Sequence, residues 1–163
     1  MKRLVVFALV SLGTVLLQTL LVRFLVVVDI VPDILLIWIV YVAIREGQLA
    51  ATVTGVALGL CVDLLSGSDG MLGLAALSKT IAGFVAGYFY NENRTSQILG
   101  GSRFIVAVAT AALVHNGLYF AIFLQGTEIG WWSIVFRYGI PTAIYTCLVA
   151  LLPMFVFARK YLS

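Results

Sequence analysis

Long apolar runs separated by short polar breaks make up almost the whole chain. The runs cover residues 4–22, 32–44, 49–65, 72–90, 104–124 and 134–157. Most are close to the 20 or so apolar residues that a helix needs to cross a bilayer, and much longer than the alternating strands of an outer-membrane barrel. The pattern predicts an all-α integral membrane protein that folds as a six-helix transmembrane bundle, with residues 1–163 forming a single transmembrane domain.

The polar breaks differ in character. Residues 29–33 contain Pro32, which suits the first turn of a new helix because its missing N–H has no partner there. The run that follows is short for a full crossing. Residues 45–47 form a tight polar turn, the Gly- and Ser-rich residues 66–70 a loop, and residues 91–103 the longest hydrophilic stretch.

Composition restricts the possible functions. Hydrophobic residues make up 63% of the chain and charged residues only 10%, and the mean hydropathy is +1.13. No stretch remains for a separate soluble catalytic domain. No basic stripe with interleaved aromatic residues is present, which argues against nucleic acid as a partner. The partner that the composition does predict is the lipid bilayer.

The basic residues predict the orientation. If the N-terminus is cytoplasmic, most of the basic residues fall on that side, as the positive-inside rule requires, and both termini are inside. The residues predicted to lie inside are Lys2, Arg3, Arg45, Arg94, Arg103, Arg159 and Lys160.

Two of the predicted spans carry stripes of small residues. Gly55 and Gly59 recur four residues apart in the third span, and Gly83 and Gly87 do so in the fourth. This G-x-x-x-G spacing allows two helix backbones to approach closely. We therefore predict a helix-packing contact between these spans, although such a pattern is a weak signal in a chain with this many glycines.

The same stripes contain two charged residues, Asp63 and Lys79. A charged side chain near the centre of a membrane helix costs about 2.5–3.5 kcal/mol on insertion scales, so each should have a partner or a purpose. If the two stripes face each other, Asp63 and Lys79 are expected to form an intramembrane pair. A role in transport or proton relay is the alternative.

The remaining polar residues within the spans are His115 and Asn116, and we expect His115 to be hydrogen-bonded to Asn116, to a backbone carbonyl or to a carboxylate. A metal site is not predicted, because the single His has no second His and the two cysteines have no CxxC spacing. No GxSxG motif, no phosphate-binding loop and no suitable carboxylate pair is present. The sequence predicts no catalytic residues and no cofactor.

Residues 31–88 resemble the MreD family of bacterial rod shape-determining proteins. The resemblance rests on the order and spacing of several short motifs: Pro32-Asp33 before an apolar helix, Arg45-Glu46-Gly47, Gly55, Gly59, Asp63-Leu64-Leu65-Ser66-Gly67 and Gly73. The rest of the chain agrees in length and hydropathy.

The resemblance implies a non-enzymatic scaffold of the inner membrane that supports lateral peptidoglycan synthesis and rod shape. Implied partners are MreC, the MreB cytoskeleton and the peptidoglycan glycosyltransferase and transpeptidase pair. It also implies a fold like that of the S-components of energy-coupling-factor vitamin transporters. Such a subunit is the alternative function, although Leu12 stands where its small-xxx-small docking motif would continue from Ala8. A small channel or proton-coupled carrier is a third possibility.

Overall fold

The computed structural model describes residues 2–21, 24, 26, 30–65, 71–123 and 130–162. Within these ranges the secondary structure is helical and no strand is formed, which confirms the all-α prediction. Some predicted features lie outside the described residues: the loop at 66–70, most of the break at 125–130, and residues 23 and 29. The helices are α1 (Lys2–Leu16) with the π-helical turn η1 (Leu17–Leu21), α2 (Ile34–Glu46), α3 (Gln48–Leu65), α4 (Leu74–Ala86) with the 3₁₀ turn η3 (Gly87–Phe89), the 3₁₀ turn η4 (Glu92–Arg94), α5 (Thr95–Leu99), α6 (Ser102–Phe123), α7 (Trp131–Ile134), the π-helical turn η5 (Val135–Gly139) and α8 (Ile140–Leu162).

Three helical stretches of the described chain are long and apolar enough to cross a membrane. They are Gln48–Leu65, Ser102–Phe123 and Trp132–Arg159, and two shorter apolar helices cover Val5–Leu20 and Leu74–Phe89. The predicted run at 32–44 corresponds to α2, which has 13 residues and is therefore about 20 Å long. The protein is thus an apolar helical membrane protein, and the count of six crossings stays a prediction.

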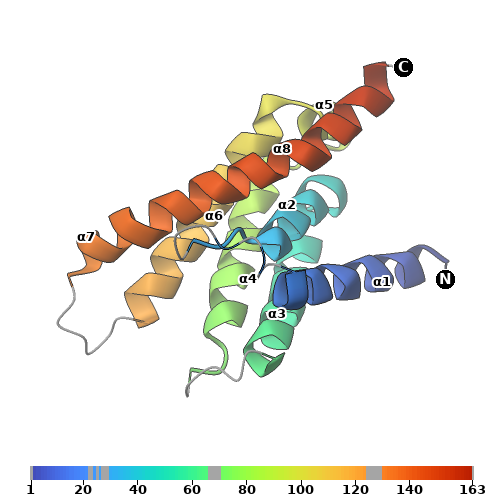
Figure 1. Ribbon diagram of the computed structural model, residues 1–163. Helices are drawn as coiled ribbons and strands as arrows, with labels where there is room; N and C mark the ends of the chain where they lie inside the picture. Colours follow the sequence, from blue (N-terminus) through green and yellow to red (C-terminus); the bar gives the residue numbers. More distant parts are fainter. Residues whose placement is uncertain are drawn as a thin grey trace.

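The short helix α2 occupies the centre of the molecule, with the other long helices around it (Figure 1). Its sequence is apolar on all sides, as expected of a helix that is surrounded by protein. Side chains from most of the circumference of α2, including Leu35, Leu36, Ile39, Val40 and Ile44, are fully buried, while the face with Ile34, Trp38 and Tyr41 is half-buried. Burial of most of its surface explains how so short a helix forms part of the membrane domain.

Helices α3 and α4 pack backbone to backbone. A Cβ atom placed on Gly59 would lie 2.3 Å from the Cα of Ala76, and one on Gly55 would lie 2.6 Å from the carbonyl oxygen of Lys79. On the other helix, a Cβ on Gly83 would lie 2.7 Å from the carbonyl oxygen of Ala51, and one on Gly87 would meet the side chain of Gln48 at 2.4 Å. All four glycines of the two stripes therefore lie at the contact between α3 and α4.

Candidate functional site

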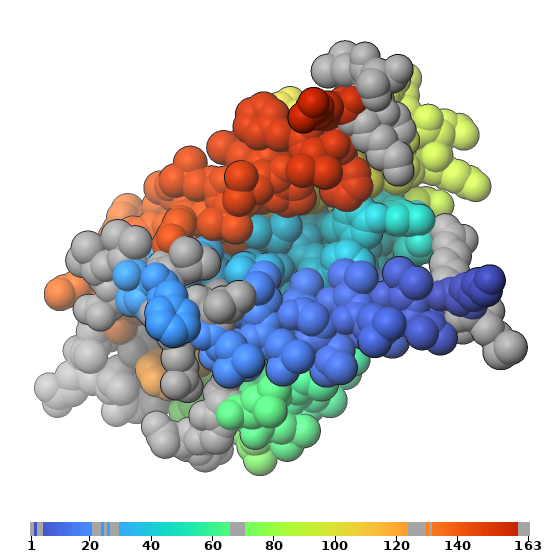
Figure 2. All heavy atoms as spheres, turned by 45° about the vertical axis from the view of Figure 1, so that its right-hand side comes forward, coloured from blue at the N-terminus to red at the C-terminus, as the bar shows by residue number. Residues whose placement is uncertain are grey.

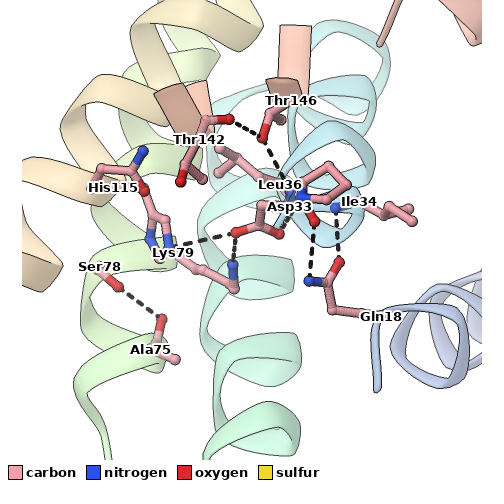
Figure 3. A network of polar contacts seen from close by, with 12 residues as sticks. Gln18, Asp33, Ile34, Leu36, Ala75, Ser78, Lys79, His115, Thr142 and Thr146 are labelled. Carbon is pink, nitrogen blue, oxygen red and sulfur yellow. Dashed lines mark hydrogen bonds and ion pairs between the residues drawn. The ribbon is translucent and has the colours of Figure 1, made fainter. Parts of the chain in front are cut away.

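A cluster of charged side chains lies inside the bundle around Asp33. This residue caps the N-terminus of α2, where its Oδ1 accepts a hydrogen bond of 2.9 Å from the backbone N–H of Leu36. Its Oδ2 accepts a charge-assisted hydrogen bond from the Nζ of Lys79 in α4 and lies 3.4 Å from the Nε2 of His115 in α6. Figure 3 shows the carboxylate between these two side chains. One carboxylate thus connects α2, α4 and α6, which are far apart in the sequence.

The cluster lies at the N-terminus of α2 and within the length of α4 and α6. By helix rise, His115 is about 20 Å from the start of α6 and about 12 Å from its end. Lys79 is about 7 Å from the start of α4 and about 10 Å from its end by the same measure. The three residues are nearly closed off, since Asp33 is 9% exposed, Lys79 4% and His115 8%. Asp33 and Lys79 are charged groups in the interior of a membrane bundle, where mutual pairing compensates for lost hydration.

Polar groups from two further helices fix the chain that leads into α2. The Oε1 of Gln18, in η1, accepts from the N–H of Ile34 at 2.8 Å, and its Nε2 donates to the carbonyl of Pro32 at 3.3 Å. The N–H of Asp33 donates to the Oγ1 of Thr146 in α8 at 3.0 Å. Non-helical backbone at this depth needs such partners because no lipid group can supply them. These contacts hold Asp33 in position to receive Lys79 and His115.

The predicted pair of Asp63 and Lys79 is wrong. Along α3, the residue beside the Lys79 backbone is Gly55. Asp63 lies eight residues further along α3, which is about 12 Å by helix rise. The two stripes do face each other, but this register separates the two charges, and the Lys79 side chain turns toward Asp33 instead.

Asp63 serves the N-terminus of α4. The N-cap position of α4 is Gly73, which has a φ of 98° and no side chain to cap the helix. The carboxylate of Asp63 accepts hydrogen bonds from the N–H groups of Gly73 at 3.0 Å, Ala75 at 3.2 Å and Ala76 at 3.1 Å. A carboxylate at a helix N-terminus is also favoured by the helix dipole. Asp63 therefore caps α4 from the neighbouring helix.

His115 and Asn116 face different partners. Of the expected partners for His115, the structure provides the carboxylate of Asp33, while no described residue forms a hydrogen bond with its Nδ1. The Nδ2 of Asn116 donates to the carbonyl of Gly139 at 2.8 Å. This bond connects α6 to η5, the π-helical turn before α8. Among the residues that the structure describes, no group of three or more His, Cys, Asp or Glu side chains is arranged to hold a metal ion.

Sequence reasoning missed Asp33 as a site residue, together with Gln18 and Thr146. The sequence does contain a signal for Asp33. The run after it is too short to cross a bilayer, so its first residue must lie within the membrane, where a carboxylate requires a cation. Lys79 is the lysine in the interior of a predicted span. No comparable signal exists for Gln18 or Thr146, because their hydrogen bonds depend on the tertiary arrangement of η1 and α8.

The apolar helices and the buried ionic cluster define an α-helical membrane protein whose charged groups bind to each other within the bundle. A comparison with known families is consistent with this class. The model of the family described as rod shape-determining protein MreD matches residues 1–163, the whole chain, and the protein belongs to this family. No curated protein and no solved structure matches the chain.

Proposed function

We propose that the protein is a non-enzymatic scaffold of the bacterial elongation machinery in the inner membrane. It binds MreC there and supports lateral peptidoglycan synthesis and rod shape. The observation that carries this proposal is the match of the whole chain to a family of shape-determining proteins. The MreB cytoskeleton and the peptidoglycan glycosyltransferase and transpeptidase pair are the further partners that we infer.

The contacts that the buried polar groups make favour a scaffold over a carrier. Asp33, Lys79 and Asp63 each bind groups of the same bundle, so their polar atoms are engaged in holding helices together. The outer surface of the bundle is apolar, as on α8, where Leu148, Leu152, Phe155 and Val156 are each more than half exposed. A surface of this kind can contact lipid or the helix of a partner by van der Waals packing.

We further propose six crossings by a single transmembrane domain, residues 1–163, with both termini in the cytoplasm. The arrangement of the basic residues supports this orientation. Lys2 and Arg45 line one groove, and Arg94 and Arg103 line a hollow beside α5. Gly100, after α5, contacts Ala158 near the end of α8. In Figure 1 both chain ends lie toward the end of the molecule where α5 is drawn. The likeness to the S-components of vitamin transporters stays a prediction.

Depletion of the protein and co-purification of MreC with it test the proposed function. Depletion of the protein in its own rod-shaped host is expected to give rounded cells that lose lateral wall growth, and affinity-tagged protein should retain MreC after detergent extraction. Cells that stay rod-shaped after depletion would overturn the scaffold function. Growth loss that an added vitamin reverses would identify a transporter subunit instead.

A further inference from the structure

A long apolar groove runs between α1 and α8, with α2 as its floor. Its volume is about 680 Å³, within the range of roughly 300–1,000 Å³ of sites for small molecules. In Figure 2, α1 in dark blue and α8 in red flank α2 in cyan. One part of the wall is a continuous row of aromatic rings, with centroids 5.0–5.8 Å apart: Phe7, Trp38, Tyr41 and Phe157.

The charged residues of the groove lie at one end. Helices α1 and α2 are antiparallel here, because Ser11 accepts a hydrogen bond from the Trp38 indole and Gln18 bonds to the N–H of Ile34. The start of α1 therefore lies beside the end of α2. Lys2, at the start of α1, lines this end of the groove together with Arg45 and Glu46, at the end of α2. Arg45 forms a salt bridge of 3.4 Å with Glu46 and donates a hydrogen bond to the hydroxyl of Tyr41. Two basic groups and one acidic group still give this end a net positive charge, and the rest of the lining is almost entirely apolar.

We propose that this groove binds an anionic phospholipid of the leaflet in which Lys2 and Arg45 lie. One acyl chain lies along the aromatic row and the phosphate contacts the two basic side chains. The distribution of charge matches an amphiphile with a negative head group and a hydrocarbon tail. The proposal does not depend on the scaffold function, since it concerns a lipid and not a protein partner.

The size of the groove argues for a chain of this kind over a helix. A membrane-crossing helix about 10 Å wide and 30 Å long occupies roughly 2,400 Å³ as a cylinder. This is larger than the groove. An extended hydrocarbon chain fills such a narrow space, whereas a partner helix can only lie across its opening.

Trp38 provides a direct probe of the groove. The chain has three tryptophans, so a full-length variant with Trp131→Phe and Trp132→Phe has Trp38 as its single tryptophan. This variant is reconstituted into vesicles of phosphatidylglycerol and phosphatidylcholine, with bromine on the acyl chains of one lipid at a time. We expect brominated phosphatidylglycerol to quench Trp38 with an apparent affinity about fivefold higher than that of brominated phosphatidylcholine, which corresponds to one net basic charge at the surface.

Two variants test the two parts of the site. Lys2→Gln with Arg45→Gln leaves Glu46 as the charged lining residue at this end and should abolish or reverse the preference for phosphatidylglycerol. The control Arg94→Gln with Arg103→Gln removes the same charge at the same end of the molecule and should leave the fivefold preference intact. Val10→Phe narrows the groove while it keeps both basic groups, and should reduce quenching by phosphatidylglycerol.

Each of three results would overturn the proposal. Equal quenching by both lipids in the parent would mean that Trp38 senses bulk lipid. Absence of quenching by either lipid would mean that protein, from α1 or from a second copy, covers the groove. An unchanged preference after neutralisation of Lys2 and Arg45 would show that these residues do not bind the head group.

Discussion

The contact between Asp33 and Lys79 predicts a strong and specific dependence of stability on their charges. The substitution Lys79→Met keeps most of the length of the side chain and removes the ammonium group. The Asp33 carboxylate, only 9% exposed, then has the N–H of Leu36 and the more distant His115 ring as its remaining contacts. Removal of one partner of a buried ion pair destabilises by about 3–5 kcal/mol because the other charge stays buried without compensation. We expect a loss of this size.

The double substitution Asp33→Asn with Lys79→Met should restore most of the lost stability. It removes both charges at once, so no uncompensated ion is buried. Asn caps a helix about as well as Asp, so the bond to the N–H of Leu36 can be kept. We expect the double variant to lie within about 1–2 kcal/mol of the parent. Since each single substitution should cost about 3–5 kcal/mol, the coupling free energy between the two sites should be at least about 4 kcal/mol.

The free energy of unfolding in mixed micelles, followed by tryptophan fluorescence during titration with a denaturing detergent, measures these differences. Arg94→Met is the matched control, because it also converts a basic residue to Met but on the exposed surface. It should change stability by no more than about 0.5 kcal/mol. The reasoning is refuted if Lys79→Met is as stable as the parent, or if the loss in the double variant equals the sum of the losses in the single variants.

Three further predictions concern other contacts of the bundle and use the same unfolding assay. Gly59→Ala places a Cβ 2.3 Å from the Cα of Ala76, so α3 and α4 must separate and we expect the free energy of unfolding to fall by about 1–3 kcal/mol. The control Gly117→Ala, with nothing within 4 Å of the added Cβ, should be neutral or stabilising. Equal effects of the two substitutions would contradict the close packing of α3 and α4. Asp63→Ala should cost about 1–2 kcal/mol because α4 loses its cap from α3, and a neutral effect would show that the cap is not needed. Phe104→Ala opens a cavity at a fully buried site and should cost about 3–5 kcal/mol, whereas a loss below 1 kcal/mol would mean that the site collapses around the smaller side chain.

The parts of the fold that depend on local pattern could be predicted from the sequence. Apolar runs gave helices whose ends lie within a few residues of the predicted ones, as for 49–65 against Gln48–Leu65 and 104–124 against Ser102–Phe123. The spacing of Gly55, Gly59 and their counterparts marked the faces of α3 and α4 that meet. Both inferences use one helix at a time, and helix periodicity alone supports them.

The partners of the charged residues could not be predicted in the same way. The choice of Asp63 for Lys79 assumed that their loop sets the register of α3 against α4. The glycine contacts set it instead, and they bring Lys79 level with Gly55. The position of Asp33 depends on the depth at which α2 begins, and this depth follows from the helices that surround α2. The helix start predicted at Pro32 therefore lies inside the bundle, which the local pattern alone did not indicate.

The contacts divide the bundle into a firmly held body and one more loosely attached helix. Displacement of α4 relative to α2 would separate Lys79 from Asp33 and leave two charges unpaired in an apolar medium, which is strongly opposed. The described contacts of α1 and its continuation η1 with α2 and the chain before it are between uncharged groups: a Ser11–Trp38 hydrogen bond, the hydrogen bonds of Gln18 and aromatic packing. The groove separates much of α1 from α8. If lipid fills this groove, the position of α1 depends on the surrounding membrane while the charged cluster keeps the remaining helices fixed. The face formed by α1 is then where the composition of the bilayer can influence the shape of the protein.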